Sequence, residues 1–187
     1  NATGGYGGTG AYQFINTIDE RIEVTNPSIP LNFTDKFTVS TWVYDPYQYG
    51  AWVNILSNID VTLDREGGYG MYVGNNGMAC WGIWKPGTEC DVCSTSIQLK
   101  NYTWHHLVGT YDSTLSTEKS KFYIDGVFQQ GYNCIYSPAK SAKFMVGNIL
   151  GPNQYSFNGY IDDVRIYNGT LSAEQIKALY ENRTDTI

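Results

Sequence analysis

The stretch Phe157–Glu181 reads FNGYIDDVRIYNGTLSAEQIKALYE, and it decides how the rest of the sequence is interpreted. Its first half, Gly159–Tyr167, mixes β-branched, aromatic and charged residues, a composition typical of a strand. Asn168-Gly169 is a turn signal, and Ser172-Ala-Glu-Gln175 has the spacing of a capping box that starts a helix. Apolar residues then recur at i, i+3 and i+4 within Ile176–Tyr180. The stretch therefore predicts a last strand, a turn and a short helix packed on the body of the protein.

Short segments that suit strands, separated by turn signals, continue through the rest of the chain. Asn76-Gly77 and Asp125-Gly126 are each flanked by two such segments and predict β-hairpins. Residues 85–93, which contain Pro-Gly, are interpreted as a loop. The other expected strands cover residues 11–15, 21–24, 37–44, 52–59, 69–73, 78–84, 105–112, 119–125, 127–131 and 143–148. Many short strands with one terminal helix predict an antiparallel two-sheet sandwich.

Four motifs, in the expected order, resemble laminin-G-like, concanavalin A-like jelly-roll modules. They are FTVSTWV at 37–43, YTWHHLVGTYD at 102–112, FYIDGV at 122–127, and GYIDDVRIYN followed by LSAEQIKALY at 159–180. The resemblance covers residues 11–181 and implies an all-β fold, an antiparallel two-sheet jelly-roll sandwich with a short C-terminal helix. Residues 1–10 would form a glycine-rich N-terminal arm, and residues 182–187 a C-terminal tail. Because this fold carries lectins, adhesion modules, pentraxin-like proteins and some glycosidases, the resemblance does not assign one function.

The composition narrows the range of partners. The chain has 187 residues, enough for one well-buried core, and a net charge of −6 at pH 7. An acidic chain without a cluster of lysine and arginine is a poor candidate for binding nucleic acid or an anionic membrane. The sequence has no run of about 18 apolar residues, so we expect no membrane insertion.

Four cysteines, Cys80, Cys90, Cys93 and Cys134, indicate an extracellular location. Cys90 and Cys93 have the spacing of zinc and redox motifs, but no second pair at comparable spacing accompanies them. We therefore predict two structural disulfides. A bond between Cys90 and Cys93 would be strained, so these two are expected to pair with Cys80 and Cys134. The sequence does not say which cysteine goes to which.

Glycosylation sequons point the same way. They begin at Asn1, Asn32, Asn101, Asn168 and Asn182. Three of them, Asn32, Asn101 and Asn168, fall just before a predicted strand or helix, where a glycan would point into water. The tripeptide also arises by chance, because asparagine and threonine suit loops. Its repeated occurrence in loops favours a glycoprotein that is secreted or held at a cell surface.

Catalytic motifs are missing from the sequence. The two histidines, His105 and His106, are neighbours in a predicted strand, so they face opposite ways and cannot form one metal pair. Glycosidases need two carboxylates, and those on this fold commonly carry an E-x-D-x-x-E strand, which this sequence lacks. It also has no G-x-S-x-G element and no phosphate-binding loop. We therefore expect a protein that is not an enzyme.

The resemblance also implies a structural calcium ion, held by strand-end carboxylates and backbone carbonyl oxygens. By position, the ligands would be Asp163 or Asp162 of the last strand together with Asp19 or Asn16 of the first hairpin. The alternative is that one of the two adjacent aspartates pairs with Arg165 or caps a loop.

Aromatic residues are the remaining candidates for ligand binding. Tyr47, Tyr49 and Trp52 crowd the loop after the first long strand. Trp84 lies three residues from Trp81 in one strand, so we expect one of the two in the core and the other near solvent. Sugar rings stack on such aromatic faces, but a protein–protein interface has the same composition. The sequence does not choose between a glycan and a protein surface as partner.

We therefore expect a non-catalytic extracellular binding or adhesion module. The first alternative is a structural subunit that assembles with further copies of itself into an extracellular filament or surface coat, and the second is an enzyme that acts on polysaccharide. Tyr6 is the one large side chain within residues 1–10, and it would anchor this arm. We hypothesise that the arm contacts a neighbouring copy; the alternative is an arm folded back on its own sheet.

Overall fold

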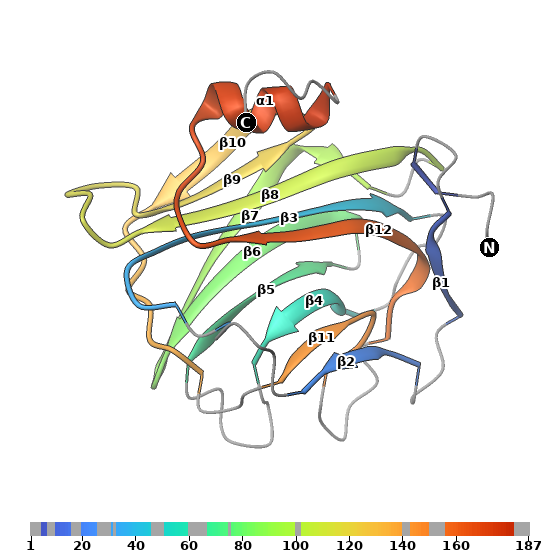
Figure 1. The fold of residues 1–187 in the computed structure, drawn as a ribbon, viewed down its shortest axis with the longest axis horizontal. Helices are drawn as coiled ribbons and strands as arrows, with labels where there is room; N and C mark the ends of the chain where they lie inside the picture. The colour runs from blue at the N-terminus through green and yellow to red at the C-terminus, as the bar shows by residue number, and fades with distance from the viewer. Residues whose placement is uncertain are drawn as a thin grey trace.

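The computed structural model of the protein describes residues 5–6, 10–15, 20–25, 31, 33–45, 51–59, 67–74, 76–99, 102–139, 143–149 and 156–181. Their strands form two antiparallel sheets that face each other across one core, and a short helix lies outside one of the sheets (Figure 1). This arrangement confirms the predicted all-β sandwich with a C-terminal helix.

Sheet A has the strand order β1-β12-β3-β8-β9-β10, and sheet B has the order β2-β11-β4-β5-β6-β7. The strands of sheet A are β1 (Tyr12–Ile15), β3 (Lys36–Tyr44), β8 (Trp104–Asp112), β9 (Ser120–Ile124), β10 (Val127–Tyr132) and β12 (Asn158–Tyr167). Those of sheet B are β2 (Ile22–Val24), β4 (Val53–Asn58), β5 (Gly68–Val73), β6 (Met78–Lys85), β7 (Thr88–Gln98) and β11 (Phe144–Val146). Strands from the two ends of the chain are neighbours in both sheets, as in a jelly roll.

The core lies between the two sheets and is rich in aromatic rings. On β3, Phe37, Val39 and Val43 face inward and are almost fully buried, as their alternation predicts. On the facing sheet, Trp81 is fully buried beneath Gly109 of β8, where an added Cβ atom would lie 2.2 Å from the indole ring. Glycine at this position therefore makes room for the largest side chain of the core.

Strand β7 corrects the sequence analysis, which placed a loop at residues 85–93. Pro86-Gly87 is only a tight turn, with Gly87 at a φ of +72°, a conformation that glycine adopts readily. The segment that follows pairs with β6 from Thr88 to Gln98. Its polar residues made it resemble a loop, but they alternate with buried Val92 and half-buried Cys90, as expected for a strand with one polar face.

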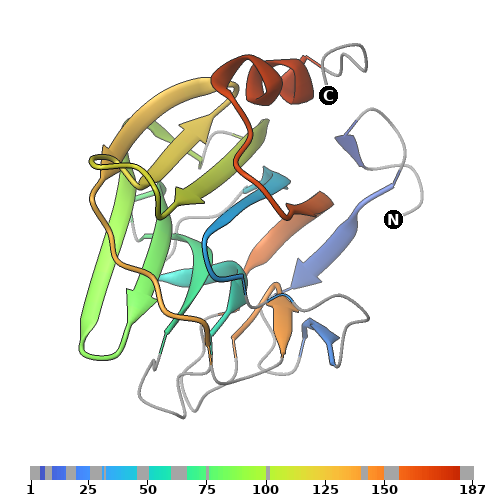
Figure 2. The ribbon, with the colours of Figure 1, turned by 60° about the vertical axis from the view of Figure 1, so that its left-hand side comes forward.

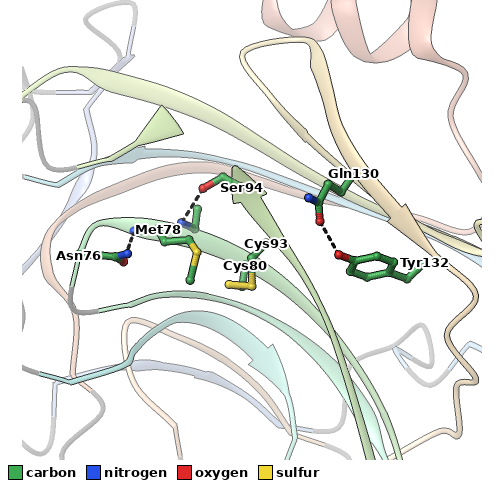
Figure 3. Close-up of a disulfide and its surroundings, with 8 residues drawn as sticks. Asn76, Met78, Cys80, Cys93, Ser94, Gln130 and Tyr132 are labelled. Atoms are coloured by element: carbon green, nitrogen blue, oxygen red, sulfur yellow. Dashed lines mark hydrogen bonds between the residues drawn. A yellow bond between two sulfur atoms is a disulfide. The ribbon is translucent and has the colours of Figure 1, made fainter. Parts of the chain in front are cut away.

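Two disulfides stabilise the side of the sandwich where β7 and β10 lie, which faces left in Figure 2. Cys80 and Cys93 are joined directly across β6 and β7, as Figure 3 shows. Cys90 is joined to Cys134, in the segment that follows β10. The structure therefore pairs Cys90 and Cys93 with the two distant cysteines, as expected, and it settles which partner each one takes.

Helix α1 (Ala173–Tyr180) packs on the outer face of sheet A (Figure 1). The predicted capping box is present: the Ser172 hydroxyl accepts a hydrogen bond from the Gln175 amide, and the Gln175 side chain accepts one from the Ser172 amide. Ile176 and Leu179 are buried, whereas Tyr180 is half-buried at the edge of the contact.

A candidate ligand-binding face on sheet B

The outer face of sheet B is built around a run of glycines in β5. The inward residues of this strand, Tyr69, Met71 and Val73, are fully buried in the core. Side chains alternate along a strand, so the outward positions on either side of Tyr72 are all glycines: Gly68, Gly70 and Gly74. Tyr72 is therefore the one β5 side chain that projects outward, and the glycines on either side of it are buried under neighbouring groups.

Three rings form a row across β4, β5 and β6 on this outer face. The ring centroid of Tyr72 lies 5.2 Å from that of Trp52, which meets it edge-on, and 6.1 Å from that of Trp84, which is nearly parallel to it. Trp52 is 42% exposed, Tyr72 is half-buried and Trp84 is only 6% exposed. We call Trp52, Tyr72 and Trp84 the aromatic row.

Glycines make room for the two tryptophans of the row against the sheet. An added Cβ atom at Gly74 would lie 2.7 Å from the ring of Trp52, and one at Gly82 would lie 2.1 Å from the ring of Trp84. Both distances are shorter than any van der Waals contact with carbon, so larger residues would displace the rings. The glycines are therefore part of the geometry of the aromatic row.

Polar groups lie beside the row on the same face. Glu89 and Asp91 of β7 stand directly opposite Trp84 and Gly82 of β6, and therefore point outward with them. The Trp84 Nε1 atom and the Ser57 Oγ atom are buried and have no hydrogen-bond partner among the described residues. Both atoms are covered by the surrounding protein, so the accessible polar groups of this face are the carboxylates of β7.

Two of the predicted ligand-binding residues, Trp52 and Trp84, belong to the aromatic row, whereas Tyr47 and Tyr49 lie outside the described residues.

The expectation that either Trp81 or Trp84 is near solvent is wrong. Trp81 fills the core, and Trp84, on the opposite face, is covered because it lies flat on glycine beside Tyr72. The sequence did not predict that Tyr72, Glu89 and Asp91 belong to this face, although the alternating glycines of β5 were a signal for Tyr72.

The two adjacent aspartates of β12 have separate partners. Asp162 Oδ2 accepts a hydrogen bond of 3.0 Å from the Tyr6 amide, and its Oδ1 accepts one from the Asp163 amide. Asp163 lies at a bulge with φ +47° and forms an ion pair of 2.7 Å with the Nε atom of Arg165. Asp163 therefore makes the ion pair with Arg165 that the sequence offered as the alternative to binding calcium.

The described residues contain only part of the predicted calcium site and do not test it. Asn16 and Asp19 lie outside the described residues, and within the described ranges no three histidine, cysteine, aspartate or glutamate side chains form a group that could hold a metal. A calcium site needs six or more oxygen ligands. Calcium binding stays a prediction from the resemblance, and it is tested by whether EDTA lowers the melting temperature of the purified protein.

The two histidines hold the β8–β9 hairpin together. His105 Nδ1 lies 2.8 Å from Asp125 Oδ2, while Asp125 Oδ1 accepts a hydrogen bond of 2.9 Å from the His106 amide. His106 itself turns to the outer face of sheet A, where its Nε2 lies 2.8 Å from Ser40 Oγ. Burial lowers the pKa of His106 to about 4, so the imidazole is neutral at pH 7. These contacts give both histidines a structural role.

An apolar cleft, which the sequence did not predict, opens on the side of the sandwich away from β7 and β10. It has a volume of about 380 Å³ and runs between β1 and β12 of sheet A and β2 and β11 of sheet B. Its rim includes Tyr12, Asp162 and Asp163. The sheets are therefore not sealed along this edge.

These observations define a class: jelly-roll sandwiches that have one sheet covered by a helix and the other carrying a row of aromatic rings. The sequence matches the Laminin_G_3 family, described as the Concanavalin A-like lectin/glucanases superfamily, over residues 16–177, and the chain belongs to this family. No curated protein matches the sequence.

Several solved structures share the fold at low sequence identity. The binding domain of botulinum neurotoxin serotype G has a TM-score of 0.73 and 16% identity, covering 94% of this chain and 43% of that one. The receptor binding domain of botulinum neurotoxin D has a TM-score of 0.71 and 17% identity, covering 93% and 44%. The native heptameric SAP-like pentraxin from Limulus polyphemus has a TM-score of 0.67 and 15% identity, covering 94% and 85%. This chain thus spans less than half the length of the toxin domains.

Proposed function

We propose that this chain is a non-catalytic extracellular binding module that recognises a neutral glycan on the outer face of sheet B. The observation that carries the proposal is the pair formed by Trp52 and Tyr72, the two accessible rings of the aromatic row, which meet edge-on on the outer face of sheet B. Such rings bind the apolar faces of sugars by stacking.

The polar groups of the same face suit sugar hydroxyls. The carboxylates of Glu89 and Asp91 accept hydrogen bonds. Two carboxylates, on a chain with a net charge of −6, would repel uronic acids and sulfated sugars at short range. The ligand class that fits best is therefore a neutral glycan.

The absence of catalysis is inferred from the same strand. Glu89 and Asp91 repeat the first two positions of the E-x-D-x-x-E spacing, but Ser94 stands at the third. The Ser94 hydroxyl accepts a hydrogen bond from the Ala79 amide and is buried, so it supplies no acid in place of the missing carboxylate. We infer binding without cleavage.

Two further features support an extracellular glycoprotein. The two disulfides belong to an oxidising compartment. Asn168, which starts a sequon, is exposed in the turn between β12 and α1. In the described part of the chain, no helix has the length and hydropathy needed to span a membrane. The names of the toxin relatives describe binding domains, which agrees with a binding role for this fold.

A panel of neutral and acidic glycans tests the proposal, with affinities of the hits measured by calorimetry. We expect neutral glycans to bind and Trp52→Ala to weaken them at least tenfold. Phe128→Ala is the matched control, because Phe128 is similarly exposed, at 45%, but lies against Tyr123 on sheet A. Retention of full affinity by Trp52→Ala, or binding of a protein partner in place of any glycan, would overturn the proposal.

A further inference from the structure

Tyr6 occupies an aromatic cradle on the outer face of sheet A. Its ring stacks on Trp42 of β3 with a centroid distance of 3.4 Å and an angle of 12°. Trp104 meets it edge-on at 6.5 Å, while His106 and Tyr180 of α1 support Trp42 from 5.0 Å and 5.7 Å. We call Trp42, Trp104, His106 and Tyr180 the cradle. Tyr6 is thus folded back on its own sheet, the alternative to the contact with a neighbouring copy that we hypothesised from the sequence.

The contact includes both the ring and the backbone amide of Tyr6. The Tyr6 amide donates a 3.0 Å hydrogen bond to Asp162 Oδ2, and this bond to a carboxylate fixes the direction of the chain as it enters the cradle. Glycines stand on both sides of Tyr6 in the sequence: Gly4, Gly5, Gly7, Gly8 and Gly10. A glycine-rich sequence carries no large side chain besides Tyr6 that could add to the contact. The cradle therefore recognises a tyrosine and its backbone amide, whichever copy of the chain supplies them.

For Tyr6 to contact its own cradle, two backbone segments of the arm must approach each other closely. Gly5 lies so near Gly10 that an added Cβ atom would be 2.3 Å from the Gly10 carbonyl oxygen. Backbone atoms cannot move aside cheaply, so the closed turn requires glycine at position 5. The contact between Tyr6 and Trp42 has no such requirement, because the cradle touches only the ring and the amide.

We propose that the cradle is a docking site for Tyr6 of a second copy, and that copies of this chain exchange their arms. An exchanged arm repeats in trans the same stacking on Trp42 and the same hydrogen bond to Asp162. Each copy has one arm segment and one cradle, so reciprocal exchange closes a dimer and one-way exchange extends a chain. The site for exchange lies on sheet A and leaves the aromatic row of sheet B accessible, so it is independent of glycan binding.

Concentration decides between the closed and the exchanged state. Attachment to the same chain gives Tyr6 an effective concentration on the order of mM at its own cradle, so the parent chain is monomeric well below that value. A Cβ atom at position 5 disfavours the closed turn and lowers this effective concentration, while the contact in trans is kept. Exchange should then become visible at lower protein concentrations.

Sedimentation velocity over a concentration series tests the proposal with three arm variants: Gly5→Ala, Tyr6→Ala and the double variant. We expect Gly5→Ala to form dimers or longer chains at concentrations at least tenfold lower than the parent. Tyr6→Ala and the double variant should stay monomeric, because the anchor is gone. All three changes lie outside the sandwich core, and unchanged far-ultraviolet circular dichroism confirms that each variant is folded.

Two results would overturn arm exchange. One is a Gly5→Ala protein that associates no more readily than the parent. The other is a Gly5→Ala oligomer that persists when Tyr6 is also removed, since a different surface would then hold the copies together. Neither result bears on Trp52 or on glycan affinity, so this proposal can fail while the glycan proposal stands.

Discussion

His106 is a buried titratable side chain of sheet A. Burial lowers its pKa to about 4, against the smaller opposing effects of Asp125 and Asp163. Between pH 6.5 and pH 4, the unfolded chain therefore binds a proton at His106 that the folded chain does not bind. Stability from this group is complete above about pH 6.5 and is lost as the pH falls toward 4.

We predict that the free energy of unfolding drops by about 2–3 kcal/mol from this histidine between pH 7 and pH 4.5. Carboxylates titrate in the same range, so the measurement is a comparison of denaturant curves for the parent and for His106→Gln. The variant should show the shallower pH dependence. Equal pH dependence in the two proteins would mean that His106 is as accessible to protons when folded as when unfolded.

For individual residues, the sequence predicted which side chains are important better than it predicted what each of them contacts. The alternation of β3 placed Phe37 and Trp42 on opposite faces correctly. Alternation along a strand did not reveal that Trp84 is buried, because this burial depends on glycines contributed by two strands. Spacing also could not decide the partner of Asp163, since the bulge that turns it toward Arg165 is a tertiary feature.

Helix α1 offers the sharpest test among the elements. Ser172→Ala removes the hydroxyl that accepts the Gln175 amide, and we predict a loss of about 1 kcal/mol in the free energy of unfolding. Ser172→Thr keeps an oxygen in place and should stay within a few tenths of a kcal/mol of the parent. Denaturant melts measure both. An alanine variant as stable as the parent would show that the cap contributes nothing to stability.

Nearly all elements were predictable because their signals are local. Turn residues mark the hairpins, and the capping box marks α1. Strand β7 was not, because a polar outward face and a Pro-Gly turn look like a loop when the partner strand is unknown. The candidate ligand-binding face was therefore not predicted either, since the side chains of Glu89 and Asp91 point in a common direction only if β7 is a strand.

At the scale of the whole molecule, the two outer faces differ in what covers them. Helix α1 and Tyr6 cover the outer face of sheet A, while no helix lies over sheet B among the described residues (Figure 2). One sheet thus serves the packing of the chain on itself, and the other presents the aromatic row. This asymmetry is why we assign ligand binding to sheet B.

Glycosylation is a prediction about the whole molecule. Asn168 is exposed, and the neighbouring Thr170 hydroxyl donates a 3.0 Å hydrogen bond to the Tyr111 carbonyl, which holds the turn against sheet A. We expect the protein isolated from its source to exceed the 21.0 kDa of the polypeptide and to return to that mass after enzymatic deglycosylation. Asn168→Gln should lower the native mass by one glycan. A native mass equal to that of the bare polypeptide would remove this argument for an extracellular location.

Indole NMR signals test the central claim, that a glycan binds on the outer face of sheet B, most directly. The chain has 5 tryptophans, and each contributes one indole N–H resonance that can be assigned by substitution. On titration with a neutral glycan, we predict shifts for Trp52 and Trp84 and none for Trp42, Trp81 or Trp104. Shifts confined to Trp42 and Trp104 would place the ligand on sheet A and contradict the account.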